Sequence, residues 1–135
     1  MQIRELSLKE LESAYELIHL LYAELSYQEF EDLIYDMRHI EYKMLGIFEE
    51  DELISYAGVS IRTDLLYKRH LYIYEFISVR QKEKYDALLF EYLIDYAKMG
   101  MCVQLVFAKH FALELLQKQA QEFRPEDMRN FVYTL

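Results

Sequence analysis

The chain has 135 residues, carries a formal net charge of −9 and contains a single cysteine, Cys102. These values exclude an internal disulfide and argue against general nucleic-acid binding, which needs a basic face. With 53% hydrophobic residues, the chain can bury a core of its own as one domain, residues 1–135. No run approaches the roughly 20 apolar residues that cross a bilayer. No Cys/His spacing resembles a zinc site, so no metal is predicted.

The cysteine content and the first residues bear on the compartment. Met1 to Glu5 lacks the apolar stretch of a signal peptide, and a chain so poor in cysteine is typical of the cytoplasm. An acidic surface attracts cationic or amine-bearing partners, and the simpler alternative is that it only keeps the chain soluble. The sequence therefore predicts a cytoplasmic protein that binds neither nucleic acid nor membrane.

The first third of the chain predicts a strand and two helices. Gln2 to Leu6 alternates as a strand does, and Ser7 and then Ser26 each begin a capping box, the second completed by Glu29. Apolar residues at steps of three and four predict one buried face on each helix. These are Leu8, Leu11, Tyr15, Ile18, Tyr22 and Leu25 in the first helix, and Phe30, Leu33, Ile34 and Met37 in the second.

The middle of the chain then changes period. Lys43 to Phe48 and Leu53 to Ile61 predict two strands that form a hairpin around the acidic turn Glu49 to Glu52. Leu71 to Val79, rich in aromatic and β-branched residues, predicts a third strand. A meander of three strands follows from this order.

The last part of the chain predicts a crossover. A helix from Lys84 to Met99 ends at Gly100, a strand runs from Cys102 to Phe107, and a helix from Lys109 to Gln121 precedes a final strand from Asn130 to Thr134. The order is β-α-α-β-β-β-α-β-α-β, and the crossover makes the strands on either side of the Lys84 helix parallel neighbours. The fold class is α/β, a mixed α+β sheet with helices on both faces.

Several segments together carry a resemblance to a known family. They are Tyr42 to Glu49 with Leu53 to Ser60, Thr63 to Tyr67 leading into Leu71 to Ser78, Glu91 to Lys98, and the set Ala112, Leu115, Leu116 and Lys118. Their order and spacing resemble the GNAT (GCN5-related) N-acetyltransferases along nearly the whole chain. The resemblance implies an acyl-CoA N-acyltransferase fold and acetyl-CoA as cofactor.

The resemblance also places the cofactor. The backbone of Phe76, Ile77 and Ser78 would bind the amide-containing arm of coenzyme A. The pyrophosphate would lie at the start of the following helix, where free amides and the helix dipole favour an anion. The residues implied there are Gln81, Lys82, Lys84, Tyr85, Asp86 and Ala87.

The cofactor loop departs from the family pattern, (Gln or Arg)-x-x-Gly-x-Gly. One register puts Gln81 first and Lys84 and Asp86 at the two glycine positions, and the other pairs Arg80 with Glu83 and Tyr85. Neither register has the glycines, and the loop is about two residues shorter than usual. Arg80, Lys82 and Lys84 would grip phosphate by side chain, and the alternative is a solvated charged turn that begins a helix.

Catalytic candidates follow from the same comparison. Glu75 lies in the otherwise apolar run Ile73 to Ile77, where the family often has an acidic residue, and a buried glutamate has the raised pKa of a general base. The alternatives are that Glu75 points to solvent or pairs with Arg62 or Arg69. Leu116 stands where the family has its proton-donating tyrosine. Three residues remain candidates for that role: Tyr133, Tyr85 and His110.

Two functions remain open at this stage. The first is transfer of an acetyl group from acetyl-CoA to a primary amine of a small-molecule or peptide acceptor. The second is a catalytically inactive member of the same fold that serves as an interaction or dimerisation module or binds another small ligand. No motif identifies the acceptor, and a homodimer, the commonest soluble assembly, is left open.

Overall fold

The computed structural model describes residues 1–108, 123–125 and 130–135. Its strands form one sheet in the order β1-β2-β3-β4-β5-β7-β6. The strands are β1 (Gln2–Glu5), β2 (Lys43–Glu49), β3 (Glu52–Asp64), β4 (Lys68–Ser78), β5 (Gln104–Ala108), β6 (Phe123–Pro125) and β7 (Asn130–Thr134). The helices are α1 (Leu11–Leu21), α2 (Tyr27–Met37) and α3 (Lys82–Met99), with short 3-10 turns at Leu8–Glu10 and Arg38–Ile40.

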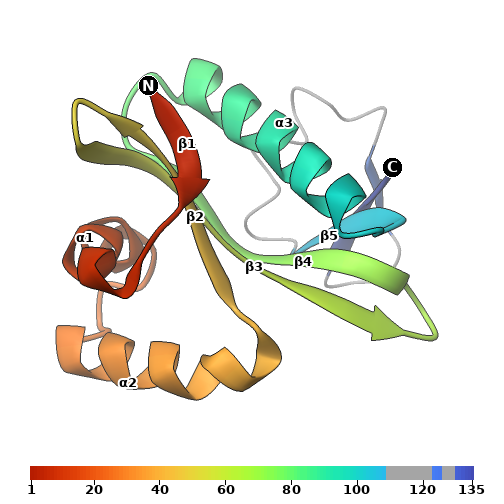
Figure 1. Ribbon diagram of the computed structural model, residues 1–135, viewed down its shortest axis with the longest axis horizontal. Coiled ribbons are helices and arrows are strands. Elements are labelled where there is room, and N and C mark those ends of the chain that lie inside the picture. Colours follow the sequence, from red (N-terminus) through yellow and green to blue (C-terminus); the bar gives the residue numbers. More distant parts are fainter. Residues whose placement is uncertain (109–122, 126–129) are drawn as a thin grey trace.

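The sheet separates two hydrophobic cores. Helices α1 and α2 lie on one face and α3 lies on the other (Figure 1). Leu45, Ile73 and Phe107 belong to the core under α3, whereas Phe48 and Tyr56 belong to the core under α1 and α2. Alternating side chains of the same strands enter both cores, as a sheet covered on two faces requires. The predicted mixed α/β architecture is confirmed.

The predicted crossover is confirmed as well. β4 and β5 pair in parallel from His70–Gln104 to Ile73–Phe107, with α3 connecting them. The predicted final strand is present as β7, which pairs antiparallel with β5. The short strand β6, paired with β7, was not predicted. The helix predicted from Lys109 to Gln121 lies outside the described residues.

The first helix is shorter than predicted. Leu8 is exposed and lies in a 3-10 turn, and α1 itself ends at Leu21. Tyr22 leaves the helix with φ −128° and ψ 77°, so neither it nor Leu25 continues the helical face. The apolar spacing predicts a helix that is too long at both ends, because the same spacing continues into the turns before and after α1.

The predicted end of the helix at Gly100 is confirmed: Gly100 caps α3 at φ −81°, and the left-handed residue that follows is Met101, at φ 63°. Two smaller predictions need correction. Leu33 is exposed, so the buried face of α2 is narrower than the predicted stripe. Cys102 is buried but precedes β5, and its amide donates to the Ala97 carbonyl at the helix end.

A charged contact fixes the entry of the chain into α1. Arg4 donates to both carboxylate oxygens of Glu10 at 2.9 Å, and the Ser7 amide donates to the same carboxylate at 2.9 Å. The Arg4 guanidinium, followed by the Ser7 amide, holds the pKa of Glu10 at about 2, below its usual value of 4.5. This contact completes the capping box that Ser7 and Glu10 predict.

We expect Glu10→Gln to lower the free energy of unfolding by about 1 kcal/mol at pH 7. Because the folded-state pKa is depressed, this stabilisation is complete above about pH 4.5 and is lost as the pH falls towards 2. Urea unfolding at pH 7 and pH 3 measures it, with exposed Glu91→Gln as control. An equal difference between Glu10→Gln and wild type at both pH values would contradict the prediction.

Candidate functional site

A bulge in β4 decides which way Glu75 points. β3 and β4 pair Gly58 with Glu75 and Val59 with Ile73, which leaves Tyr74 as an extra residue. Strict alternation would put Glu75 on the same face as Ile73, in the core under α3. The extra residue turns Glu75 to the opposite face, and Phe76 packs under α3 in its place.

On the face of α1 and α2, Glu75 meets tyrosine hydroxyls. Tyr42 Oη donates to Glu75 Oε1, and Tyr22 Oη donates to Oε2 at 3.4 Å. Tyr56 Oη lies 2.7 Å from Tyr42 Oη. These tyrosines come from the end of α1, the residue before β2 and the middle of β3, so three separate parts of the chain meet at one carboxylate.

Glu75 has no ion-pair partner within the described part of the chain. Arg62 places its guanidinium 4.8 Å from the centre of the Tyr72 ring, and Arg69 donates to the Gly100 carbonyl at 2.7 Å. The predicted alternative, that Glu75 pairs with one of these two arginines, is therefore wrong. The carboxylate is stabilised by neutral hydroxyl donors instead of by a cation.

This environment sets the protonation of the site. Burial raises the pKa of Glu75 to about 7, while the hydrogen bonds from Tyr42 and Tyr22 act in the opposite direction. Burial also raises the pKa of Tyr42, Tyr56 and Tyr22, so these hydroxyls keep their protons at neutral pH. A carboxylate that titrates near neutrality and is held by protonated donors is suited to accept a proton.

Gly58 makes room for this arrangement. It lies opposite Glu75 on β3, and a Cβ atom at this position would collide with Tyr42 Oη and Glu75 Oε1. Any side chain here would therefore separate the carboxylate from its donor. The requirement is one of space, because no glycine of the described chain has a positive φ.

β4 and β5 part next to Glu75. Their pairing ends at Ile73 and Phe107, whereas β4 continues to Ser78. Within the described residues, no strand pairs with β4 on this side beyond Ile73. The backbone of Phe76, Ile77 and Ser78 therefore borders the opening, while their side chains pack under α3, under α1 and α2, and against Ser55.

The turn after β4 divides the predicted phosphate-binding residues. Gln81, Lys82, Lys84 and Ala87 are exposed at the start of α3, whereas Tyr85 and Asp86 are buried. The Tyr85 hydroxyl donates to Glu49 at 3.2 Å. The exposed side chains at the helix start can contact an anion, whereas the buried Tyr85 and Asp86 side chains cannot.

The backbone of this turn takes a conformation that usually needs glycine. Gln81 has φ 43° and ψ 49°, and its carbonyl accepts the amides of Lys84 and Tyr85 at 3.0 and 3.1 Å. A left-handed residue other than glycine costs roughly 1–2 kcal/mol. The chain therefore keeps a tight turn here without the family's glycines.

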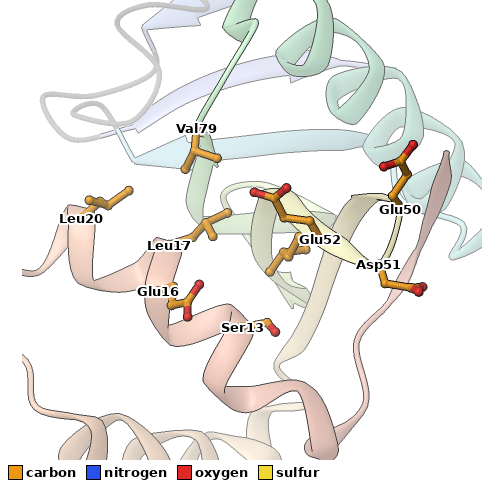
Figure 2. Close-up of a pocket in the computed structure, with 9 residues that line it drawn as sticks. Ser13, Glu16, Leu17, Leu20, Glu50, Asp51, Glu52 and Val79 are labelled. Carbon is orange, nitrogen blue, oxygen red and sulfur yellow. The ribbon is translucent and has the colours of Figure 1, made fainter.

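An acidic pocket lies beside this turn. Glu50, Asp51 and Glu52 of the β2–β3 turn and Glu16 of α1 line it together with Val79, the residue after β4 (Figure 2). Arg80, predicted to help hold phosphate, instead lies 3.4 Å from Glu52. The acidic residues of the pocket repel an anion. Because Arg80 contacts Glu52, Lys82 and Lys84 are the exposed cations at the helix start that remain available to a phosphate.

The proton-donor candidates are distributed unevenly. His110 lies outside the described residues, as does Leu116 at the position of the family's tyrosine. The Tyr85 hydroxyl is bonded to Glu49, and Tyr133 packs edge-on against Phe90. Tyr22, which is 38% exposed and donates to Glu75, was not predicted as a site residue. The sequence carries no signal for it, because the apolar spacing of the first helix continues through Tyr22 to Leu25.

Residues 1–108, 123–125 and 130–135 contain no group of three or more His, Cys, Asp or Glu side chains that could hold a metal ion. Of the helices described there, none has the length and apolar character to cross a bilayer.

Comparison with known proteins gives structural matches only. No family model and no curated protein matches the sequence. The PaiA N-acetyltransferase of Thermoplasma acidophilum, solved with coenzyme A, is 14% identical with a TM-score of 0.70 over 99% of this chain and 98% of its own.

Two other acetyltransferases match in the same way. The aminoglycoside 6'-acetyltransferase type Ii is 13% identical with a TM-score of 0.76, over 99% of this chain and 97% of its own. The glucosamine-6-phosphate N-acetyltransferase of Arabidopsis thaliana is 16% identical with a TM-score of 0.67, over 89% of each chain. The chain thus has the fold of the GNAT N-acetyltransferases, as its sequence predicts.

We expect Gly58→Ala to lower the free energy of unfolding by about 1–3 kcal/mol and to break the Tyr42–Glu75 contact, because the added methyl has no space. Thermal unfolding and a crystal structure of the variant would measure both effects. Gly100→Ala is the control, since its Cβ would approach only the tip of the Ile61 side chain at under 3.0 Å. A Gly58→Ala variant as stable as wild type, with the contact intact, would refute the steric argument.

Proposed function

We propose that this chain is an N-acetyltransferase of the GNAT superfamily that transfers an acetyl group from acetyl-CoA to a primary amine. The observation that carries the proposal is Glu75, a carboxylate with a pKa of about 7 at the point where β4 and β5 part. Structural neighbours solved with coenzyme A, such as the Thermoplasma enzyme, support the choice of cofactor.

The chemistry assigns a task to each part of the site. Bound acetyl-CoA would supply an activated thioester. Glu75 would remove a proton from the acceptor nitrogen, because a primary amine is protonated at neutral pH and attacks only in its neutral form. Tyr22, at the exposed side of the carboxylate, would border the acceptor, and its raised pKa keeps its hydroxyl a donor.

The cofactor would be held in two places. The backbone of Phe76, Ile77 and Ser78 would hydrogen bond to the amide-containing arm along the open edge of β4. Lys82 and Lys84, with the first amides of α3, would face the phosphates. The fit is good along the strand edge and weaker at the turn, where the carboxylates of the acidic pocket oppose an anion.

The acceptor is proposed only as a class. The net charge of −9 and the carboxylate at the site favour a cationic small molecule or peptide with a primary amine, in the cytoplasm. Aminoglycoside and amino-sugar acceptors belong to the neighbours and are not assigned to this chain.

Three features of the turn after β4 favour a second function. The turn after β4 lacks glycine, Arg80 is engaged by Glu52, and acidic residues line the adjacent pocket. A chain that no longer binds coenzyme A would have these features, and it would serve as an interaction or dimerisation module or bind another small ligand. Measuring cofactor binding separates the two functions.

We expect acetyl-CoA and coenzyme A each to bind one-to-one in calorimetric titration, and the Lys82→Glu/Lys84→Glu variant to bind at least tenfold more weakly. The reason is that these side chains are the exposed cations at the helix start. Lys98→Glu, at the far end of α3, is the charge-matched control. Absence of heat and of thermal stabilisation at millimolar cofactor would refute the enzyme and favour the module.

We expect Glu75→Gln to reduce kcat/KM for an amine acceptor by about 10²-fold or more while binding coenzyme A like wild type. The wild-type kcat/KM should fall below a pH of about 7, where Glu75 becomes protonated. Because the folded-state pKa of Glu75 is raised, the free energy of unfolding of the wild type falls as the pH rises from about 4.5 to 7. Glu75→Gln removes this fall, so a loss of activity in the variant at pH 7 does not come from a loss of stability. Unchanged kcat/KM in Glu75→Gln would exclude Glu75 as the base.

A further inference from the structure

The hydroxyls behind Glu75 form a chain with a fixed direction. Tyr42 Oη carries one proton, and it donates this proton to Glu75 Oε1. The contact of 2.7 Å between Tyr42 and Tyr56 must then be a hydrogen bond that Tyr56 donates and Tyr42 accepts. A donor that itself accepts a hydrogen bond is a stronger donor, so Tyr56 reinforces the bond from Tyr42 to Glu75.

The backbone makes this chain rigid. Tyr56 is fully buried in the middle of β3, and the Tyr74 bulge sets the direction of Glu75. Gly58, two residues after Tyr56 on β3, leaves just enough space for the Tyr42 hydroxyl to meet the Glu75 carboxylate. The Tyr42 ring also packs on the Tyr74 ring at 5.6 Å between centres. The position of Oε1 is therefore fixed from both strands.

The two oxygens of the carboxylate have different surroundings. Oε1 faces the partly buried Tyr42, whereas Oε2 faces the more exposed Tyr22 at 3.4 Å, longer than a strong hydrogen bond. Among the described residues, Tyr22 is the hydrogen-bond donor to Oε2, so Oε2 is the oxygen that can meet a molecule entering from the Tyr22 side.

We propose that Tyr42 is a positioning residue for Glu75: with Tyr56 behind it and Gly58 beside it, its hydroxyl holds Oε1 and presents Oε2 to the amine. This inference rests on the proposed function for its role in catalysis, although its geometric part does not. In this proposal Tyr42 acts through the carboxylate and takes no part in the chemistry itself.

The same contact sets the pH range in which Glu75 is ionised. The titratable groups that interact with it in the described residues are Tyr22 after α1, Tyr42 before β2 and Tyr56 in β3. Their raised pKa values keep these three hydroxyls protonated near pH 7. Because Tyr42 stabilises the ionised carboxylate, its hydroxyl extends the range in which Glu75 is a base towards lower pH.

The test is a ¹³C NMR titration of the Glu75 carboxyl in protein labelled at glutamate, assigned with Glu75→Gln. In Tyr42→Phe the midpoint should rise by about one pH unit, since a hydrogen bond to the charged form is lost. Tyr56→Phe should shift it in the same direction by less. Tyr35→Phe, an exposed tyrosine on α2, is the matched control and should leave the midpoint unchanged.

The kinetic arm follows the same variants. If the chain transfers acetyl groups, the acid limb of kcat/KM in Tyr42→Phe should move to higher pH by the shift that NMR gives, with affinity for coenzyme A unchanged. An unmoved Glu75 midpoint in both Tyr42→Phe and Tyr56→Phe would overturn the inference. A moved midpoint in a protein that shows no transfer to any amine would retain the positioning and overturn the proposed function alone.

Discussion

Removing a carboxylate from water costs free energy unless the carboxylate gains hydrogen bonds or a charged partner. The described structure around Glu75 supplies hydrogen bonds. Within the described residues no cation offsets the cost, since Arg62 and Arg69, the arginines on β3 and β4, contact a tyrosine ring and a backbone carbonyl instead. Tyrosine hydroxyls from three elements donate to the carboxylate or to one another. The tyrosine abundance of the sequence thus has a specific use at this point, beyond filling a core.

The element order could be predicted because it depends on local signals: capping boxes, changes of period and the crossover helix. Glu75 also stood out, since a glutamate in an apolar strand needs a reason. Its partners could not be predicted, because Tyr22, Tyr42 and Tyr56 are far apart in sequence and only the tertiary fold brings them together. The bulge at Tyr74 has no sequence signature either, and without it the alternation of β4 puts Glu75 on the wrong face.

The two halves of the site differ in how far they agree with an acetyltransferase. Glu75, with a pKa of about 7, and the edge of β4, which has no strand partner beyond Ile73 within the described residues, suit the proposed acetyl transfer. The turn that would meet the phosphates suits it less well, because it lacks glycine and lies next to acidic residues. Salt screens the repulsion between these carboxylates and an anion, so cofactor binding at the turn would depend on ionic strength. Glu75 lies in a partly buried cluster, where salt screens charges less than at the surface.

The Tyr74 bulge makes the face on which Glu75 lies depend on how β3 and β4 pair. Loss of Tyr74 would restore unbroken alternation and leave Glu75 on its present face, because Val59–Ile73 and Gly58–Glu75 are already consecutive pairs. Pairing without the bulge but with Tyr74 retained would instead shift every later residue of β4 by one position, sending Glu75 under α3 and Phe76 among the tyrosines. The tolerance of this strand is therefore asymmetric: a β4 shortened at Tyr74 keeps the tyrosine contacts of Glu75, whereas a β4 lengthened by one residue at this point must absorb it in a larger bulge to keep them.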